Sequence, residues 1–168
     1  MNRIKSKSGF ISIVAIILGG TVFIMMLWLM MDLTYYAQQN RSTKNILDNA
    51  TASAVTLVDE SSLGGGDIKF LNQEAVEMAK NIIKRELFLD ENGQPTAQSP
   101  LREAPDIRIY VIDDVDKENG TLVNVAGVKN IRVKNPSIIA YAKLPMRGLF
   151  FKGKGPTFQQ ISASQVFY

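Results

Sequence analysis

The feature that most constrains this chain is an unbroken apolar run from Gly9 to Met31. It holds no charged residue, and its only polar side chains, Ser12 and Thr21, can bond back to carbonyl groups of the same helix. A bilayer core about 30 Å thick needs about 20 apolar residues in a helix. A secretory signal has a shorter apolar region, of about 7–15 residues, and ends at an Ala-x-Ala-like site. The sequence therefore predicts a membrane-spanning helix at residues 9–31.

The charges are distributed unevenly around this run. Three basic residues precede it, every acidic residue lies at Asp32 or later, and residues 32–168 carry equal numbers of basic and acidic residues. This balance gives no support to a nucleic-acid-binding face. A basic leader before a spanning helix predicts a cytoplasmic N-terminus and an exported remainder. We therefore expect a basic cytoplasmic leader (1–8), a transmembrane helix (9–31), an extracytoplasmic continuation of that helix (32–60) and an extracytoplasmic domain (61–168).

The chain contains no cysteine and no histidine. Thiolate zinc sites, Cys–His dyads, Ser–His–Asp triads and histidine proton shuttles are therefore excluded. No other motif singles out an active site. We predict a protein that is not an enzyme, with no cofactor and no small-molecule substrate.

The helical pattern continues beyond the apolar run, because no proline or glycine occurs between Leu33 and Glu60. Apolar residues recur there at helical spacing and predict a narrow stripe along one face. Its members are Leu33, Tyr36, Ala37, Leu47, Ala50, Ala54 and Val58. A single helix from about Phe10 to Val58 would be roughly 70 Å long. A second helix is predicted between Phe70 and Leu89, with Asn72 as its N-cap.

From Asp106 the apolar period changes to two, which is typical of strands. Asn119-Gly120 is a strong hairpin signal and predicts that the strand from Asp106 pairs with residues 121–128. Further strands are expected at 131–133, 138–144 and 157–168. The predicted fold is α+β: a long N-terminal transmembrane and amphipathic helix, a second helix, and then a small antiparallel sheet.

Three other features have competing interpretations. Gly64-Gly65-Gly66 is interpreted as a joint between the helices, since it lacks the flanking residues of a phosphate-binding loop. The acidic residues Asp114, Asp116 and Glu118 are interpreted as a solvated hairpin tip, with calcium binding as the alternative. The basic residues around Phe150-Phe151 are interpreted as an ordinary loop, with contact to anionic lipid or wall polymer as the alternative.

The N-terminal motifs support a more specific hypothesis. The basic leader, Lys7-Ser8-Gly9-Phe10 and an apolar helix that runs into an amphipathic one resemble the type IV pilin superfamily. Asp32-Leu-Thr-Tyr35-Tyr36, followed by an alanine-rich stretch through Ala50 and Ala54, is similar to TadE/TadG-like proteins of tight-adherence pilus systems. The resemblance covers residues 7–58 and, more loosely, 138–166.

This resemblance implies a pilin-like fold and a pseudopilin or minor pilin-like role, with no catalysis. It implies cleavage by a prepilin peptidase between Gly9 and Phe10. The residues expected in helix assembly or anchoring are Val14, Asp32, Tyr35, Tyr36, Leu47, Ala50 and Ala54. Family members usually carry a glutamate five residues into the mature chain, where this chain has Val14. A polymerised pilin and an uncleaved, permanently anchored accessory subunit therefore both remain open.

The expected partners are the lipid bilayer of a bacterial cell membrane and other pilin-like subunits or filament assembly machinery. The alternative function is a membrane-tethered extracellular binding module for a cell-wall polymer, a partner protein or calcium.

Overall fold

The computed structural model describes residues 3–59, 69–149 and 155–166, with side chains described from residue 10 onward. The elements in chain order are α1 (Arg3–Ala54), α3 (Asn72–Glu86), β1 (Asp106–Ile112), β2 (Thr121–Val125), β3 (Lys129–Val133), β4 (Ser137–Pro145) and β5 (Thr157–Gln165). The predicted α+β class, with a long N-terminal helix, a second helix and small antiparallel sheets, is confirmed.

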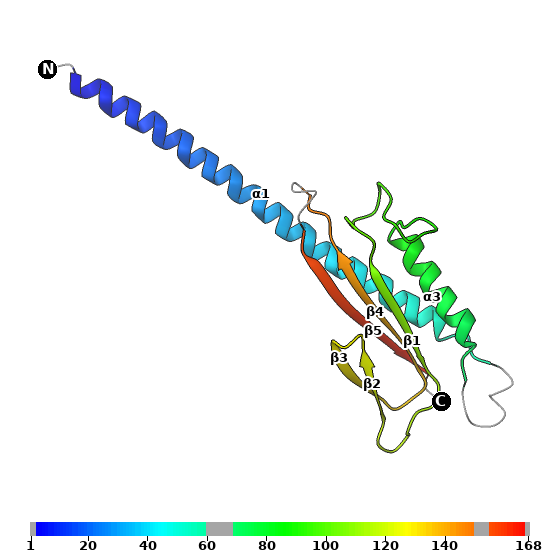
Figure 1. Ribbon diagram of the computed structural model, residues 1–168. Helices are drawn as coiled ribbons and strands as arrows, with labels where there is room; N and C mark the ends of the chain where they lie inside the picture. The colour runs from blue at the N-terminus through cyan, green and yellow to red at the C-terminus, as the bar shows by residue number, and fades with distance from the viewer. Residues whose placement is uncertain (1–2, 60–68, 150–154, 167–168) are drawn as a thin grey trace.

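The helix α1 is continuous over 52 residues, a length of about 78 Å. Its first half projects away from the rest of the molecule, and its second half lies along the sheet (Figure 1). It ends four residues before the predicted Val58, because the chain there becomes extended and Val58 forms an antiparallel bridge with Phe70. The Leu71 amide donates to the Leu57 carbonyl at 3.0 Å across the same bridge.

The predicted second helix is α3, but its predicted N-cap is wrong. Asn72 is the first helical residue; the capping position is Leu71, whose side chain supplies no hydrogen bond. Ala75, Ala79 and Ile83 form the buried face of α3 at spacings of four. This face packs against α1 and β1.

A three-stranded antiparallel sheet has the order β1-β4-β5, so β4 is the central strand. Side chains of β4 alternate between two hydrophobic clusters. Ile138, Ala140, Ala142 and Leu144 face the helices, while Ile139 and Tyr141 face the separate β2-β3 pair on the other side of the sheet. Strand β4 is therefore buried on both faces, which explains why it reads as an almost continuous apolar run.

The predicted pairing across Asn119-Gly120 is wrong. Strand β1 pairs with β4, and β2 pairs instead with β3 through a turn at residues 126–128. Asn119-Gly120 forms a tight turn between the two sheets, in which the Gly120 amide donates to the Asp116 carbonyl at 2.8 Å. Gly120 has φ +74° there, and a Cβ would lie 2.8 Å from Cγ of Arg132. The turn therefore favours glycine because of its own backbone conformation, although the strands before and after it, β1 and β2, do not pair with each other.

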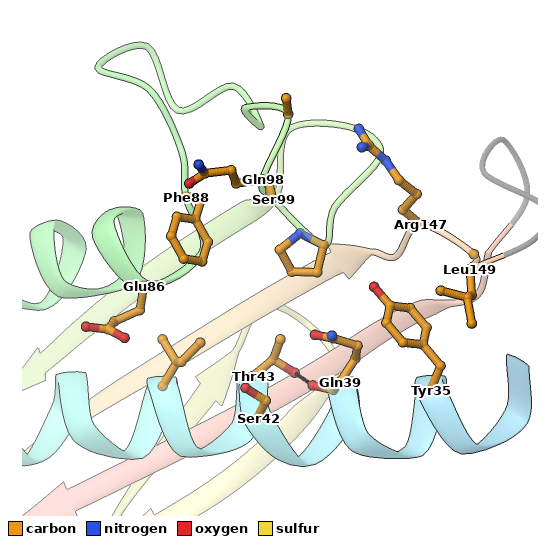
Figure 2. A pocket seen from close by; sticks show the side chains of 14 residues that line it. Tyr35, Gln39, Ser42, Thr43, Glu86, Phe88, Gln98, Ser99, Arg147 and Leu149 are labelled. Carbon is orange, nitrogen blue, oxygen red and sulfur yellow. Dashed lines mark hydrogen bonds between the residues drawn. The ribbon is translucent and has the colours of Figure 1, made fainter. Parts of the chain in front are cut away.

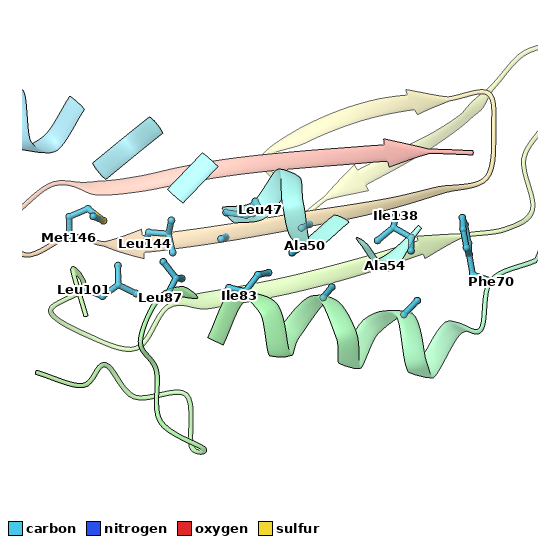
Figure 3. Close-up of a cluster of buried hydrophobic side chains, with 14 residues drawn as sticks. Leu47, Ala50, Ala54, Phe70, Ile83, Leu87, Leu101, Ile138, Leu144 and Met146 are labelled. Atoms are coloured by element: carbon cyan, nitrogen blue, oxygen red, sulfur yellow. The ribbon is translucent and has the colours of Figure 1, made fainter. Parts of the chain in front are cut away.

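The larger core lies between the sheet and the two helices. Leu47, Ala50 and Ala54 of α1 meet Ile83 and Leu87 from the α3 side, over the β4 residues already named (Figure 3). All five are fully buried. This core fixes the C-terminal half of α1 to the domain, whereas the large apolar side chains described from Phe10 to Met31 are exposed.

Candidate functional site

The most unusual surface of the molecule is the N-terminal half of α1. Large apolar side chains project from every side of the helix between Phe10 and Met31, with Phe10 69% exposed. Within the described part of the chain, α1 is the one helix long and apolar enough to cross a membrane, and none of its most apolar stretch is buried inside the molecule. A helix apolar on all sides is stable when lipid or other helices surround it. This segment is therefore a candidate single membrane anchor, as the sequence predicted.

The predicted assembly residues fall into two groups. Val14 is 38% exposed on the projecting half of the helix. Leu47, Ala50 and Ala54 are fully buried in the chain's own core, so they hold α1 to its domain and are not accessible to a second subunit. The apolar stripe predicted from Leu33 is also interrupted, because Leu33 is 60% exposed.

Asp32 marks the point at which the domain begins to touch the helix. It follows the apolar run directly, yet it is only 6% exposed, and its Oδ1 accepts a hydrogen bond from the Leu149 amide at 3.1 Å. The contact joins the end of the apolar run to the segment that follows β4. Sequence reasoning identified Asp32 as the end of the membrane segment but could not give it this partner, 117 residues away.

The two aromatic residues after Asp32 have different surroundings. Their rings lie 6.0 Å apart at 59°. Tyr36 packs against the main core, whereas Tyr35 lines a cavity beside the helix. Trp28 is about half exposed one turn before Asp32.

A polar seam joins α1 to β5; we use this name for Asn40, Asp48 and Thr51 on the helix together with Gln160, Ser162 and Ser164 on the strand. The Gln160 Nε2 atom donates to the backbone carbonyl and to Oδ1 of Asn40, both at 2.7 Å. The Thr51 hydroxyl lies 3.0 Å from that of Ser162 and 2.9 Å from that of Ser164. Ser162 also donates to Asp48, which is paired with Lys44.

Sequence reasoning missed the polar seam. A signal was available, because Gln160, Ser162 and Ser164 stand at alternate positions of the strand and so lie on one face of it. Polar residues at alternate positions of the strand, together with polar residues at helical spacing on α1, would have indicated a hydrogen-bonded contact. The seam fixes the position of α1 along β5, because each donor must meet its acceptor.

A cavity of about 400 Å³ opens where α1 leaves its apolar half. Tyr35, Gln39 and Thr43 of α1 form one wall, and Phe88 and Ser99 from the segment after α3 form another (Figure 2). The segment after β4 closes the third side with Arg147 and Leu149. The Ser99 hydroxyl donates to the Leu87 carbonyl at 2.7 Å and the Thr43 hydroxyl to the Gln39 carbonyl at 2.8 Å, so both serve the fold.

Among the acidic residues considered for calcium, Asp116 has a structural role in the turn before β2. Oδ1 of Asp116 accepts hydrogen bonds from the amides of Asn119 and Glu118, at 3.0 and 2.9 Å, and its Oδ2 accepts from the Asn119 side chain. The backbone hydrogen bond from Asn119, followed by the side-chain bond from the same residue, lowers the pKa of Asp116. Among the described residues, no three acidic side chains lie close enough together to hold a metal ion. This statement covers Asp114, Asp116 and Glu118.

Some predicted features lie outside the described residues. These are the triple glycine at 64–66 and the segment 150–154 with Phe150, Phe151 and their flanking lysines. Gly9 and Phe10 lie within α1, where the side chain of Phe10 is described.

Comparison with known proteins gives no relative: no protein-family model, curated protein or solved structure matches this chain.

Proposed function

We propose that this chain is a non-enzymatic, membrane-anchored pilin-like component of a type IV or tight-adherence-like surface filament. Its apolar half would lie in the cell membrane or in a filament core, with the N-terminus cytoplasmic and the domain outside. The TadE/TadG-like motifs around Asp32, Tyr35 and Tyr36 motivate the family.

The observation that carries this proposal is the two-part character of α1. One uninterrupted helix carries an apolar run, exposed on all sides from Phe10 to Met31, and a C-terminal half joined to an α+β domain by core packing and the polar seam. Such a helix can remain rigid while its apolar half exchanges lipid neighbours for helix neighbours. That is what a subunit needs if it is first stored in a membrane and then assembled.

Deletion of residues 9–31 tests the proposal. The full chain and the deletion variant are expressed in the native host, and complexes are isolated from membranes and medium. We expect the full chain to enter assemblies with its own copies or with filament proteins, and the deletion variant to be monomeric. A deletion variant that retains the same partners would contradict helix-mediated assembly.

The same experiment tests the second candidate function, a membrane-tethered binding module. The observation that favours this function is the cavity lined by Tyr35 and Arg147, which could hold a ligand. A soluble domain that still binds its ligand as a monomer would support the module.

N-terminal sequencing separates the two forms of the pilin-like proposal. A mature chain beginning at Phe10 indicates processing and polymerisation. A chain that retains Met1 indicates a permanently anchored accessory subunit and rules out the processed form.

A further inference from the structure

The cavity beside Tyr35 continues into an apolar groove on the membrane half of α1. The groove has a volume of about 400 Å³ and is lined by Leu27, Met30 and Met31 together with Thr34. Tyr35 and Leu149 line both the groove and the cavity, so the two spaces adjoin. A long molecule could therefore pass from an apolar surface to a polar one at this point.

The contact between Asp32 and Leu149 places this junction at the end of the apolar run. Leu149 is tied to Asp32 by its amide, and Arg147 is tied by its own amide to the Pro100 carbonyl at 2.8 Å. These two hydrogen bonds hold the segment after β4 beside the last turn of the apolar run. If residues 9–31 span a bilayer, this is the level of the lipid headgroups.

The polar part of the junction is suited to a negative group. The Arg147 guanidinium makes no ion pair with any carboxylate of the described residues, and the Tyr35 hydroxyl makes no hydrogen bond within the same ranges. The one acidic side chain among the described cavity residues is Glu86, which pairs with Arg85 at 3.2 Å. Glu86 and Arg147 lie at opposite ends of the cavity (Figure 2).

We propose that this junction binds one phospholipid with a net negative headgroup, taken from the leaflet in which α1 leaves the membrane. The acyl chain lies along Leu27, Met30 and Met31, and the phosphate lies between the Arg147 guanidinium and the Tyr35 hydroxyl. Guanidinium groups bind phosphate strongly and can do so in a bidentate geometry. This inference rests on the membrane anchoring included in the proposed function. It adds a specific lipid partner that would orient the domain on the membrane surface.

Trp28 is a natural probe of the groove because it is the single tryptophan of the chain. It lies three residues before Met31 and seven before Tyr35, on the same side of the helix. The full chain is reconstituted in vesicles of phosphatidylcholine with a minor fraction of phosphatidylglycerol. Bromine atoms, which quench tryptophan fluorescence, are placed on the acyl chains of one lipid or the other. We expect brominated phosphatidylglycerol to quench Trp28 well beyond its share of the lipid.

Arg147→Gln should reduce the preference for phosphatidylglycerol about fivefold, since one basic side chain near an anionic surface contributes about that factor. Arg147→Lys should retain most of the preference. Arg132→Gln is the matched control, because Arg132 is exposed on β3 and the substitution removes the same charge. It should behave as the unmodified chain. If Arg147→Gln fails to fold, two other single variants are compared. Tyr35→Phe should lower the preference for phosphatidylglycerol, and Arg147→Lys should retain it.

The possible failures can be told apart. If neither brominated lipid quenches Trp28, the helix is not in the bilayer and the anchoring itself is wrong. If both quench in proportion to their amounts, or if Arg147→Gln and Arg132→Gln weaken the preference equally, the lipid site is wrong while the anchoring stands. If glycerol phosphate binds the full chain in detergent as tightly as phosphatidylglycerol does, the acyl chain contributes nothing, the cavity takes a free phosphate compound, and the lipid assignment is overturned.

Discussion

Thr51 is the residue of α1 that contacts two serines of β5, Ser162 and Ser164, within the polar seam. It is fully buried, and its hydroxyl reaches both Ser162 and Ser164 as well as carbonyls of its own helix. Thr51→Val keeps the side-chain volume but leaves the serines without this partner. We expect a loss of about 1–3 kcal/mol in the free energy of unfolding, measured by denaturant unfolding of the full chain in detergent.

Thr34→Val is the matched control for this prediction. Thr34 also donates to the carbonyl four residues before it, Met30, at 2.9 Å, but it is exposed and makes no hydrogen bond to the described residues of β5. Its substitution should change stability by much less. Equal effects of the two substitutions would show that the polar seam contributes nothing beyond the local helix bond.

Asp116 supplies a prediction about pH. The hydrogen bonds from Asn119 and Glu118 lower its pKa in the folded chain, so it binds protons less readily when folded than when unfolded. Its contribution to stability is therefore present above the unfolded pKa of about 3.9 and is lost as the pH falls through the lower, folded value. Asp116→Asn should flatten the fall in the unfolding midpoint over this acid range.

Asp114→Asn is the control for the pH measurement. Asp114 is exposed and accepts no hydrogen bond from another described residue. An Asp116→Asn chain with the acid dependence of the unmodified protein would contradict the role given to the Asp116 turn.

At the scale of elements, the attachment of α1 depends on its C-terminal half. Leu47 is fully buried between the sheet and α3, and Leu47→Ala removes a large side chain from that core. We expect a loss of about 2–5 kcal/mol in the free energy of unfolding. Leu33→Ala makes the same chemical change at a residue that is 60% exposed and should have little effect on unfolding of the domain. Comparable losses would mean that the domain also packs on the helix near Leu33.

The sequence predicted the elements far better than their pairing. Helical spacing located α1 and α3, and period-two alternation located the strands, because both signals arise within one element. The pairing of β1 with β4 joins segments separated by the whole β2-β3 hairpin, and no local pattern specifies it. Asn119-Gly120 misled the prediction because a turn signal gives the shape of a turn but not the partner of the strand before it.

The candidate site shows the same division. The exposed apolar half of α1 could be predicted because lipid selects for composition and length alone. The Asp32–Leu149 contact and the cavity beside Tyr35 could not, because they depend on where a segment more than a hundred residues later comes to lie. Leu47, Ala50 and Ala54 fitted both a subunit interface and an internal core, since the two require the same apolar spacing.

At the scale of the whole molecule, one helix serves two environments. The most apolar stretch of α1 is not buried by any other described part of the chain, whereas the C-terminal half is held by a core and by the polar seam. The domain therefore stays attached at one end of a rigid rod. Any association with other subunits in the membrane must be made by the exposed half.

The most direct test of this account is a cysteine scan of the exposed half of α1. Because the chain has no cysteine, single substitutions from Ile16 to Met26 can be oxidised in native membranes and their disulfide-linked dimers counted. Leu47→Cys is the buried control and should give no dimer. We expect dimers at positions that repeat every three to four residues, because helices that meet along one face bring such positions together. An absence of dimers at every scanned position of the membrane-embedded protein would contradict it.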